Sequence, residues 1–332
     1  MTALVGPVRS DLRGGGTWTP LQRAKNDALW LAGTAAIGLA RRASLQSLRV
    51  AGRLTGRAAH ALGARARQVA LDNVARVLPT LDARARSALV RRCFETQGEL
   101  LGETVALLLS AGRPALIEVN ETSRGALDEA RAEGKGVVLA SAHLGPWENV
   151  AASLVAAGVP LVAIVRESYD RRFDALHAEL RRATGVRTIG RSSPRAPFEI
   201  VRALRRGEVL GVPMDLRSRV ASIDVPFLGH PAPTPVGPAR IALRTAAPVV
   251  VATVAPRTGP SAGTETEGYD AVVLEIVVTR VSTSDLRADA AGAAELTARI
   301  NTELSARILA LPHAWPWMHE RWPAKRGYAG GG

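Results

Sequence analysis

A histidine and a glutamate stand five residues apart at the end of a short apolar run. The stretch from Lys135 to Asn149 reads K-G-V-V-L-A-S-A-H-L-G-P-W-E-N. Its apolar part predicts a buried strand that ends at His143, and Pro146 suits the first position of a following helix. On one continuous helix this spacing would put His143 and Glu148 about 140° apart. The two side chains can therefore meet only across a strand-turn-helix corner.

Such a corner predicts acid–base chemistry. A carboxylate bound to one imidazole nitrogen fixes the tautomer and leaves the other nitrogen free to accept a proton. We therefore expect His143 and Glu148 to form a hydrogen-bonded pair that activates a substrate hydroxyl without a protein nucleophile. The alternative is that His143 is a packing residue and that Glu148 balances the helix dipole.

The elements that must position this pair alternate between strand and helix. The predicted strands cover 137–142, 159–165, 186–189, 208–214, 248–254 and 271–279, and the predicted helices cover 146–157, 169–184, 196–206, 236–246 and 289–311. This alternation predicts an α/β fold with a mostly parallel sheet and helices on both faces, its last two strands paired as a hairpin. Ligands of such sheets bind beyond the carboxyl ends of the strands. His143, Arg166 and Asp215 follow three different strands, so we expect them to share one cleft.

The first quarter of the chain is strongly basic. The 332 residues carry a formal net charge of +13, and residues 1–92 hold sixteen Arg and Lys against four Asp and Glu. A partner of opposite charge is either an anionic membrane surface or a nucleic acid. Few aromatic residues interleave with these arginines, which argues against stacking on single strands. A membrane surface is therefore the expected partner, and nucleic acid is not.

An apolar segment lies inside this basic region. Residues 28–40 are apolar for thirteen positions, which is short of the ~20 needed to span a bilayer. We expect an interfacial anchor helix with Trp30 at the headgroup level; the alternative is an ordinary core helix. Residues 43–110 predict further helices with arginines on their polar faces. Four leucines are spaced for a buried stripe: Leu45, Leu48, Leu54 and Leu62.

These patterns divide the chain into four parts. We expect a flexible N-terminus over 1–24, a basic helical membrane-associating segment over 25–112, an α/β domain over 113–325 and a flexible tail over 326–332. The single cysteine, Cys93, excludes a disulfide framework and a cysteine-based zinc site. The sequence also lacks a P-loop, a G-x-G-x-x-G fingerprint, a G-x-S-x-G elbow and an H-E-x-x-H zinc motif. No metal or resident cofactor is expected.

Five blocks occur in the order typical of one family. These blocks are H-L-G-P-W-E at 143–148, V-R-E-S-Y-D-R-R-F-D-A-L at 165–176, G-V-P-M-D-L-R at 211–217 with V-P-F-L-G at 225–229, T-P-V-G-P-A-R-I-A-L at 234–243, and W-P-W-M-H-E-R-W at 315–322. The sequence resembles the lysophospholipid acyltransferase superfamily, in its branch of lipid A biosynthesis (lauroyl/myristoyl) and phosphatidylinositol mannoside acyltransferases. Two departures stand out, since Pro146 replaces the usual Asn and Glu320 stands where a basic residue is frequent.

The resemblance implies a glycerol-3-phosphate acyltransferase-like fold and a membrane-associated O-acyltransferase. The enzyme would transfer a fatty acyl chain from acyl-CoA or acyl carrier protein, as co-substrate, to a hydroxyl of a glycolipid or lysophospholipid. His143 would act as general base oriented by Glu148, with no covalent acyl-enzyme, and backbone amides around Gly145 would stabilise the oxyanion. The implied substrate-binding residues are Gly145, Trp147, Arg166, Met214, Asp215 and Arg217.

Several roles stay open at this stage. Arg166 binds a phosphate or pairs with a neighbour such as Asp170, and Asp215 binds acceptor hydroxyls or pairs with Arg217. The tryptophans of 315–322 are expected to form a packed or interfacial tail. The same dyad would also serve a thioesterase or esterase, and a non-catalytic basic binding protein is the third alternative. The expected location is the cytoplasmic face of the inner or plasma membrane, with the protein peripheral or N-terminally anchored.

Overall fold

The computed structural model describes residues 17–109, 117–166, 168, 170–218, 220–257 and 273–322. Four helices come first: α1 (Pro20–Ala40), α2 (Leu45–Leu62), α3 (Ala64–Val77) and α4 (Ala83–Leu109). The α/β part has helices α5 (Glu121–Ala132), α6 (Trp147–Ala156), α7 (Arg171–Ala183), α8 (Ala196–Arg205), α9 (Gly237–Thr245) and α10 (Ala290–Ala310). A short 3₁₀ turn, η3 (Pro312–Ala314), follows α10.

A seven-stranded sheet forms the centre of the α/β part, in the order β1-β9-β8-β2-β5-β3-β4. Its strands are β1 (Glu118–Val119), β2 (Val137–Ser141), β3 (Leu161–Val165), β4 (Arg187–Gly190), β5 (Val209–Pro213), β8 (Val249–Pro256) and β9 (Leu274–Val281). Every neighbouring pair is parallel except β8 and β9, which are antiparallel as the predicted hairpin requires. The mostly parallel α/β fold predicted from the sequence is confirmed.

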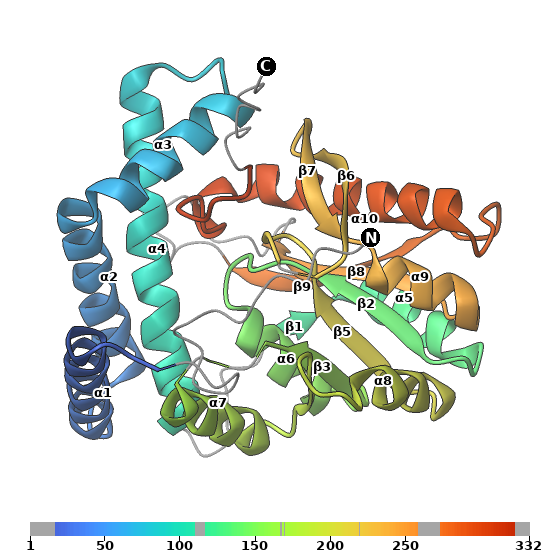
Figure 1. Cartoon of the computed structure of the whole chain (residues 1–332), viewed down its shortest axis with the longest axis horizontal. Coiled ribbons are helices and arrows are strands. Elements are labelled where there is room, and N and C mark those ends of the chain that lie inside the picture. Colours follow the sequence, from blue (N-terminus) through green and yellow to red (C-terminus); the bar gives the residue numbers. More distant parts are fainter. Residues whose placement is uncertain are drawn as a thin grey trace.

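The direction of each crossover sorts the helices into two layers. Among the connections between parallel strands, those through α6 and α7 step along the sheet in one direction, and those through α8 and α9 step back. Because such crossovers are right-handed, these two sets cover opposite faces of the sheet. Helix α10 lies beside α9 (Figure 1). The sequence did not predict β1 or the separate antiparallel hairpin of β6 (Ser222–Phe227) and β7 (His230–Pro235).

Helices α2 and α4 run side by side next to the α/β part (Figure 1). They touch along glycines: a Cβ built on Gly98 would lie 2.0 Å from the carbonyl oxygen of Gly52, and one on Gly56 would lie 2.1 Å from that of Phe94. The expected buried leucine stripe of α2 is wrong, because Leu45 and Leu48 are only half-buried and Leu54 and Leu62 are 55% and 85% exposed. The buried positions of α2 are the glycines, since only they allow this close approach.

Arginines of α2 pair with glutamates of α4. Nε of Arg49 lies 2.9 Å from Oε1 of Glu103, and Nε of Arg57 lies 2.9 Å from Oε1 of Glu95. Between these two rungs, Arg53 bonds the fully buried Glu99. Part of the positive charge counted over residues 1–92 is therefore neutralised within the fold by glutamates that follow residue 92.

Helix α1 begins earlier than the sequence predicted. The side chain of Thr19 accepts a hydrogen bond from the backbone N–H of Gln22, and the side chain of Gln22 accepts one from the backbone N–H of Thr19. This reciprocal pair is a capping box at the start of the helix. Residues 20–24, expected to be flexible, are therefore helical. The rest of the expected flexible N-terminus before residue 17, the boundary near 112 and the tail 326–332 lie outside the described residues. No helix within the described ranges has the length and apolar character to cross a membrane.

Candidate active site

His143 lies two residues beyond the end of β2, in the turn that leads to α6. Gly145 makes this turn with a φ of +61°, a left-handed conformation that glycine adopts without strain. Helix α6 then begins at Trp147 and carries Glu148 in its first turn. The predicted strand-turn-helix corner is confirmed.

Asp215, and not Glu148, holds the His143 ring. Nδ1 of His143 lies 2.9 Å from Oδ1 of Asp215, and the backbone N–H of His143 donates to Oδ2 at 2.9 Å. Asp215 is fully buried and follows β5, the parallel neighbour of β2. Neither of the two roles considered for Asp215, acceptor binding or pairing with Arg217, matches this contact.

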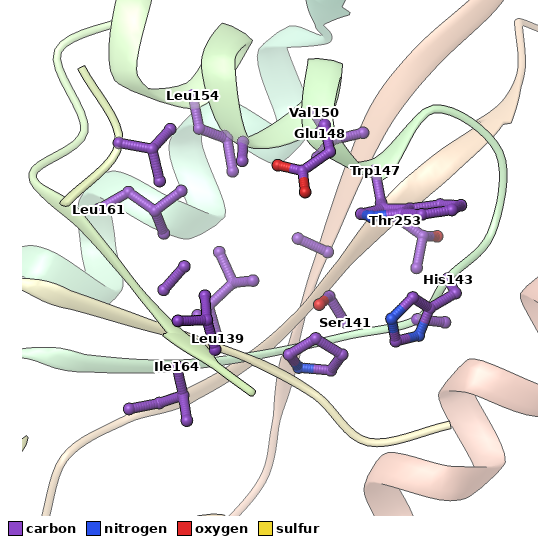
Figure 2. A pocket seen from close by; sticks show the side chains of 18 of the residues that line it. Leu139, Ser141, His143, Trp147, Glu148, Val150, Leu154, Leu161, Ile164 and Thr253 are labelled. Carbon is purple, nitrogen blue, oxygen red and sulfur yellow. The ribbon is translucent and has the colours of Figure 1, made fainter. Parts of the chain in front are cut away.

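Glu148 pairs with α7 instead. Its Oε1 accepts a hydrogen bond from Arg181 at 3.0 Å, and no hydrogen bond between Glu148 and His143 occurs among the described residues. Figure 2 shows both side chains at the same cavity, Glu148 from α6 and His143 from the end of β2. The predicted direct contact is therefore wrong, because Arg181 takes the carboxylate that the sequence assigned to the imidazole.

Charge and burial together set the proton affinity of the pair. Burial alone would lower the pKa of His143, but the charge of Asp215, the bond to it and the charge of Glu148 raise that pKa above its ordinary value. Burial alone would raise the pKa of Asp215, but the His143 charge and the N–H donors around the carboxylate lower it. An ionised Asp215 only accepts hydrogen bonds, so Nδ1 carries the proton and Nε2 is left as the basic nitrogen.

A cavity of about 250 Å³ opens beside His143. It lies between α6 and the strands β2, β3 and β5, and its wall is mainly apolar (Figure 2). The apolar residues include Leu139, Leu144, Val150, Leu154, Leu161 and Ile164. His143, Glu148, Arg166 and Arg181 add polar groups to the same wall. An alkyl chain would find an apolar environment there, next to a basic nitrogen.

The remaining residues predicted to bind substrate differ in their placement. Trp147 lines the cavity and contacts the His143 ring edge-on, with 5.2 Å between ring centroids. Arg166 also lines the cavity, and the expected partner Asp170 bonds Arg172 instead. Met214 is fully buried, and Arg217 is exposed. Neither of these last two is among the residues that line the cavity.

The Gly145 amide is already in use. Its N–H donates to the carbonyl of Ala314 at 3.1 Å. The segment after α10 therefore occupies this donor, and stabilisation of an oxyanion by the other amides around Gly145 stays a prediction. Within the described ranges, no group of three His, Cys, Asp or Glu side chains is arranged to hold a metal ion.

Sequence reasoning missed one neighbour of the His143–Asp215 pair, which is called the dyad from here on. The indole Nε1–H of the fully buried Trp315 donates to Oδ2 of Asp215 at 2.8 Å. The W-P-W-M-H-E-R-W block was the available signal, and it predicted a packed or interfacial tail without a contact to Asp215. A hundred residues separate the two partners along the chain, so only the tertiary fold reveals the contact.

Two comparisons relate this chain to known proteins. A family model described as bacterial lipid A biosynthesis acyltransferase matches residues 22–324. Two phosphatidylinositol mannoside acyltransferases of Mycobacterium tuberculosis, from strains CDC 1551 / Oshkosh and ATCC 25618 / H37Rv, are each 29% identical over 183 residues. These matches cover 53% of this chain and 57% of each relative, so the chain spans little more than half the length of the curated relatives.

Proposed function

The chain belongs to the bacterial lipid A biosynthesis acyltransferase family, and from this membership we propose that it is an O-acyltransferase. It moves a fatty acyl chain from an acyl thioester to a hydroxyl of a glycolipid. The family description and the names of the two relatives both refer to sugar-bearing lipids, which favours a glycolipid over a simple lysophospholipid. The observation that carries the proposal is the His143–Asp215 pair beside an apolar cavity.

The reaction follows from the protonation state of His143. Nε2 takes the proton of the acceptor hydroxyl, and the hydroxyl oxygen attacks the thioester carbonyl. Asp215 stabilises the imidazolium that forms. The tetrahedral intermediate then collapses, the C–S bond breaks, and His143 returns the proton to the leaving thiolate. The products are an ester and a free thiol.

Direct attack is supported by the surroundings of the ring. No serine hydroxyl or cysteine thiol is hydrogen-bonded to His143 among the described residues. The lone cysteine, Cys93, is buried, and burial raises the pKa of its thiol to about 12. A thiol with this pKa does not supply a thiolate near neutral pH. The chain therefore needs no covalent acyl-enzyme.

We assign the acyl chain to the apolar cavity under α6. This cavity lies between α6 and the strands β2, β3 and β5. Glu148 and Arg181 lie in its wall as an ion pair with side chains 17% and 19% exposed. The negative charge of Glu148 favours the imidazolium, so Glu148 supports the proton transfer without touching the ring. Arg166, at the end of β3, is the candidate for a phosphate of the donor or acceptor.

Membrane association is the second part of the proposal. The first two helices carry large apolar side chains that are exposed to solvent instead of packing in the core: Leu21, Leu29, Leu31, Leu39, Leu54 and Leu62. Exposed arginines follow α1 at positions 41 and 42. Apolar side chains beside basic ones suit a helix that lies in the interface of an anionic membrane. Trp30 of α1 packs edge-on against Phe173 of α7, and its position at headgroup level stays part of the proposal.

The decisive experiment is a transfer assay with purified protein. Labelled palmitoyl-CoA and palmitoyl acyl carrier protein are each incubated with total bacterial lipid, and the products are identified by mass spectrometry. We expect an acylated glycolipid with the wild type and with His60→Gln, a remote histidine of α2, and at least ~10²-fold less with His143→Ala. The donor that gives product identifies the co-substrate.

Two outcomes contradict the proposal. Free fatty acid without acylated lipid would make the protein a thioesterase. An acyl adduct on the intact protein, detected by its added mass, would replace direct attack with a covalent route. Circular dichroism of His143→Ala must match the wild type for the comparison to count.

A further inference from the structure

The donor that Trp315 offers to Asp215 has no assigned role in the reaction. Oδ2 of Asp215 accepts two bonds, from the His143 amide at 2.9 Å and from the Trp315 indole at 2.8 Å. Oδ1 is thereby left to the imidazole alone. With both bonds on Oδ2, rotation of the carboxylate about its own axis would break one of them. The two donors to Oδ2 therefore fix the orientation of Oδ1 of Asp215 toward Nδ1 of His143.

The backbone around Trp315 is itself tied to the site. The carbonyl of Ala314 accepts bonds from the Gly145 amide at 3.1 Å and from the Gln97 side chain at 3.1 Å. The carbonyl of Trp315 accepts the Cys93 thiol at 3.1 Å. The indole thus has a fixed position relative to both α4 and the turn that carries His143. A donor that is fixed in advance costs nothing to align during the reaction.

A packing role alone does not account for this geometry. Trp317 is also fully buried and contacts Trp315 with 4.9 Å between ring centroids. Its Nε1–H, however, donates to the carbonyl of Pro312 at 2.6 Å and does not bond Asp215. The two tryptophans therefore share burial and surroundings, and differ in the partner of the indole N–H. This difference gives a matched pair of substitutions.

We propose that Trp315 is a positioning residue of the acyl transfer, whose indole N–H holds Asp215 in the orientation that binds Nδ1 of His143. The inference rests on the proposed function of His143 as general base. It predicts that loss of the N–H slows catalysis while substrate binding is preserved, because the indole lies behind the dyad and is not among the residues that line the cavity. It also predicts a changed proton affinity of the dyad, because the carboxylate loses a donor that disperses its charge.

The test compares Trp315→Phe with Trp317→Phe. Phenylalanine keeps an aromatic ring and removes the N–H, and both variants are first checked by thermal unfolding. We expect kcat of Trp315→Phe to fall about tenfold with KM changed less than threefold, since one neutral donor to a charged group contributes on the order of 1.4 kcal/mol. Trp317→Phe should keep kcat and KM within about twofold of the wild type at a temperature where it is folded.

A second readout does not depend on activity. The pKa of His143 is measured by NMR titration of protein with ¹⁵N-labelled histidine, with the His143 signal assigned from its loss in His143→Ala. We expect a higher pKa in Trp315→Phe than in the wild type, because the carboxylate carries more of its own charge, and no change in Trp317→Phe. An unchanged pKa, or an equal shift in both variants, would overturn the positioning role. If the wild type transfers no acyl chain but the pKa shift is found, the proposed function fails and the hydrogen-bond role stands.

Discussion

Two fully buried carboxylates, Glu99 and Asp215, are held in different ways. Glu99 lies between α2 and α4, where Arg53 bonds it and Arg92 approaches to 3.5 Å. Asp215 lies at the carboxyl end of β5, where its donors are the ring and amide of His143 and the indole of Trp315. An arginine keeps its charge at every pH at which a protein is folded. Glu99 is therefore always bonded to a cation, whereas Asp215 is bonded to one only when His143 is protonated. The buried Arg321 acts on Asp215 through its charge, and no hydrogen bond joins the two in the part of the chain that the structure describes.

The difference separates a carboxylate that stabilises the contact of two helices, Glu99, from one that is proposed to take part in the proton transfer, Asp215. The α2–α4 pair places a permanent positive charge beside each glutamate, so the contact is the same at every stage of a reaction. The dyad leaves the carboxylate with two neutral donors and one titratable partner, so its charge is available when His143 accepts a proton. Five substitutions or conditions test this comparison.

The largest expected effect comes from Asp215→Asn. Asparagine keeps the size of the side chain but offers no charge to the imidazolium and can hold the wrong tautomer, so kcat/KM should fall on the order of 10³-fold. The matched change, Glu99→Gln, should keep kcat/KM within about threefold and lower the free energy of unfolding by about 1–3 kcal/mol. Transfer assays and urea unfolding measure both. A catalytic loss of similar size in the two variants would remove the distinction between the carboxylates.

Glu148→Gln should have an intermediate effect, about 10- to 100-fold on kcat/KM. Its charge acts on His143 across the cavity without a hydrogen bond, and its loss also frees Arg181. Glu179→Gln changes an exposed carboxylate of α7 and should leave the rate unchanged. A loss with Glu148→Gln that equals the loss with Asp215→Asn would mean that Glu148 contacts the ring or the substrate during the reaction.

The sequence predicted the position of His143 but not the partner of its ring. His143 and Glu148 are close in the chain, so local patterns were enough to predict the strand, the turn and the helix. Asp215 reaches the ring because β2 and β5 are neighbours, with Ser141 opposite Pro213 in the register. Strand order is a property of the whole sheet, and no local pattern around Asp215 reveals it. The buried position of Met214 and the Trp315 contact were missed for the same reason.

The N-terminal helices show the same limit. Periodicity predicted helices over 43–110 and a buried leucine stripe on α2. The structure has the helices but buries Gly52 and Gly56, because Gly98 of α4 packs directly against the backbone of both. A leucine stripe normally predicts burial, but two helices that touch along their backbones leave the leucines outside. The glutamates that neutralise the arginines of α2 are likewise visible only when the two helices are placed side by side.

Gly98→Ala tests the close contact of α2 and α4. The new methyl group would lie 2.0 Å from the carbonyl oxygen of Gly52, so the helices must move apart, at a cost of about 1–3 kcal/mol. Gly38→Ala on α1 meets nothing within 4 Å and should instead stabilise its helix by about 0.5–1 kcal/mol. Urea unfolding measures both. Equal effects of the two changes would show that the helix pair tolerates a wider spacing.

The pH dependence should separate the dyad from the ion pairs. His143 must be neutral to accept a proton, and its pKa in the folded protein lies above the ordinary 6.5. The logarithm of kcat/KM should therefore fall by about one unit for each pH unit below that pKa. The stabilising contribution of protonated His143 runs the other way: it is fully present below about pH 6.5 and is lost as pH rises through the folded pKa. Unfolding of the wild type and His143→Gln at several pH values measures this loss; a rate that rises toward acid pH would contradict the role of base.

The smallest effect on stability is expected from the exposed leucines of α2. Leu54 and Leu62 leave 55% and 85% of their surface in solvent, so replacing both by serine should change the free energy of unfolding by less than about 0.5 kcal/mol each. If these side chains enter a membrane interface, the same change removes apolar area from that contact and weakens sedimentation with phosphatidylglycerol vesicles. Binding should also weaken as salt is raised, because the arginines act through charge.

Glu95→Gln, which removes the ion pair with Arg57 and leaves the leucines intact, is the control: it should lower the free energy of unfolding and retain vesicle binding. Unchanged binding of the double serine variant would mean that α2 faces water, and would leave α1 alone to carry membrane association.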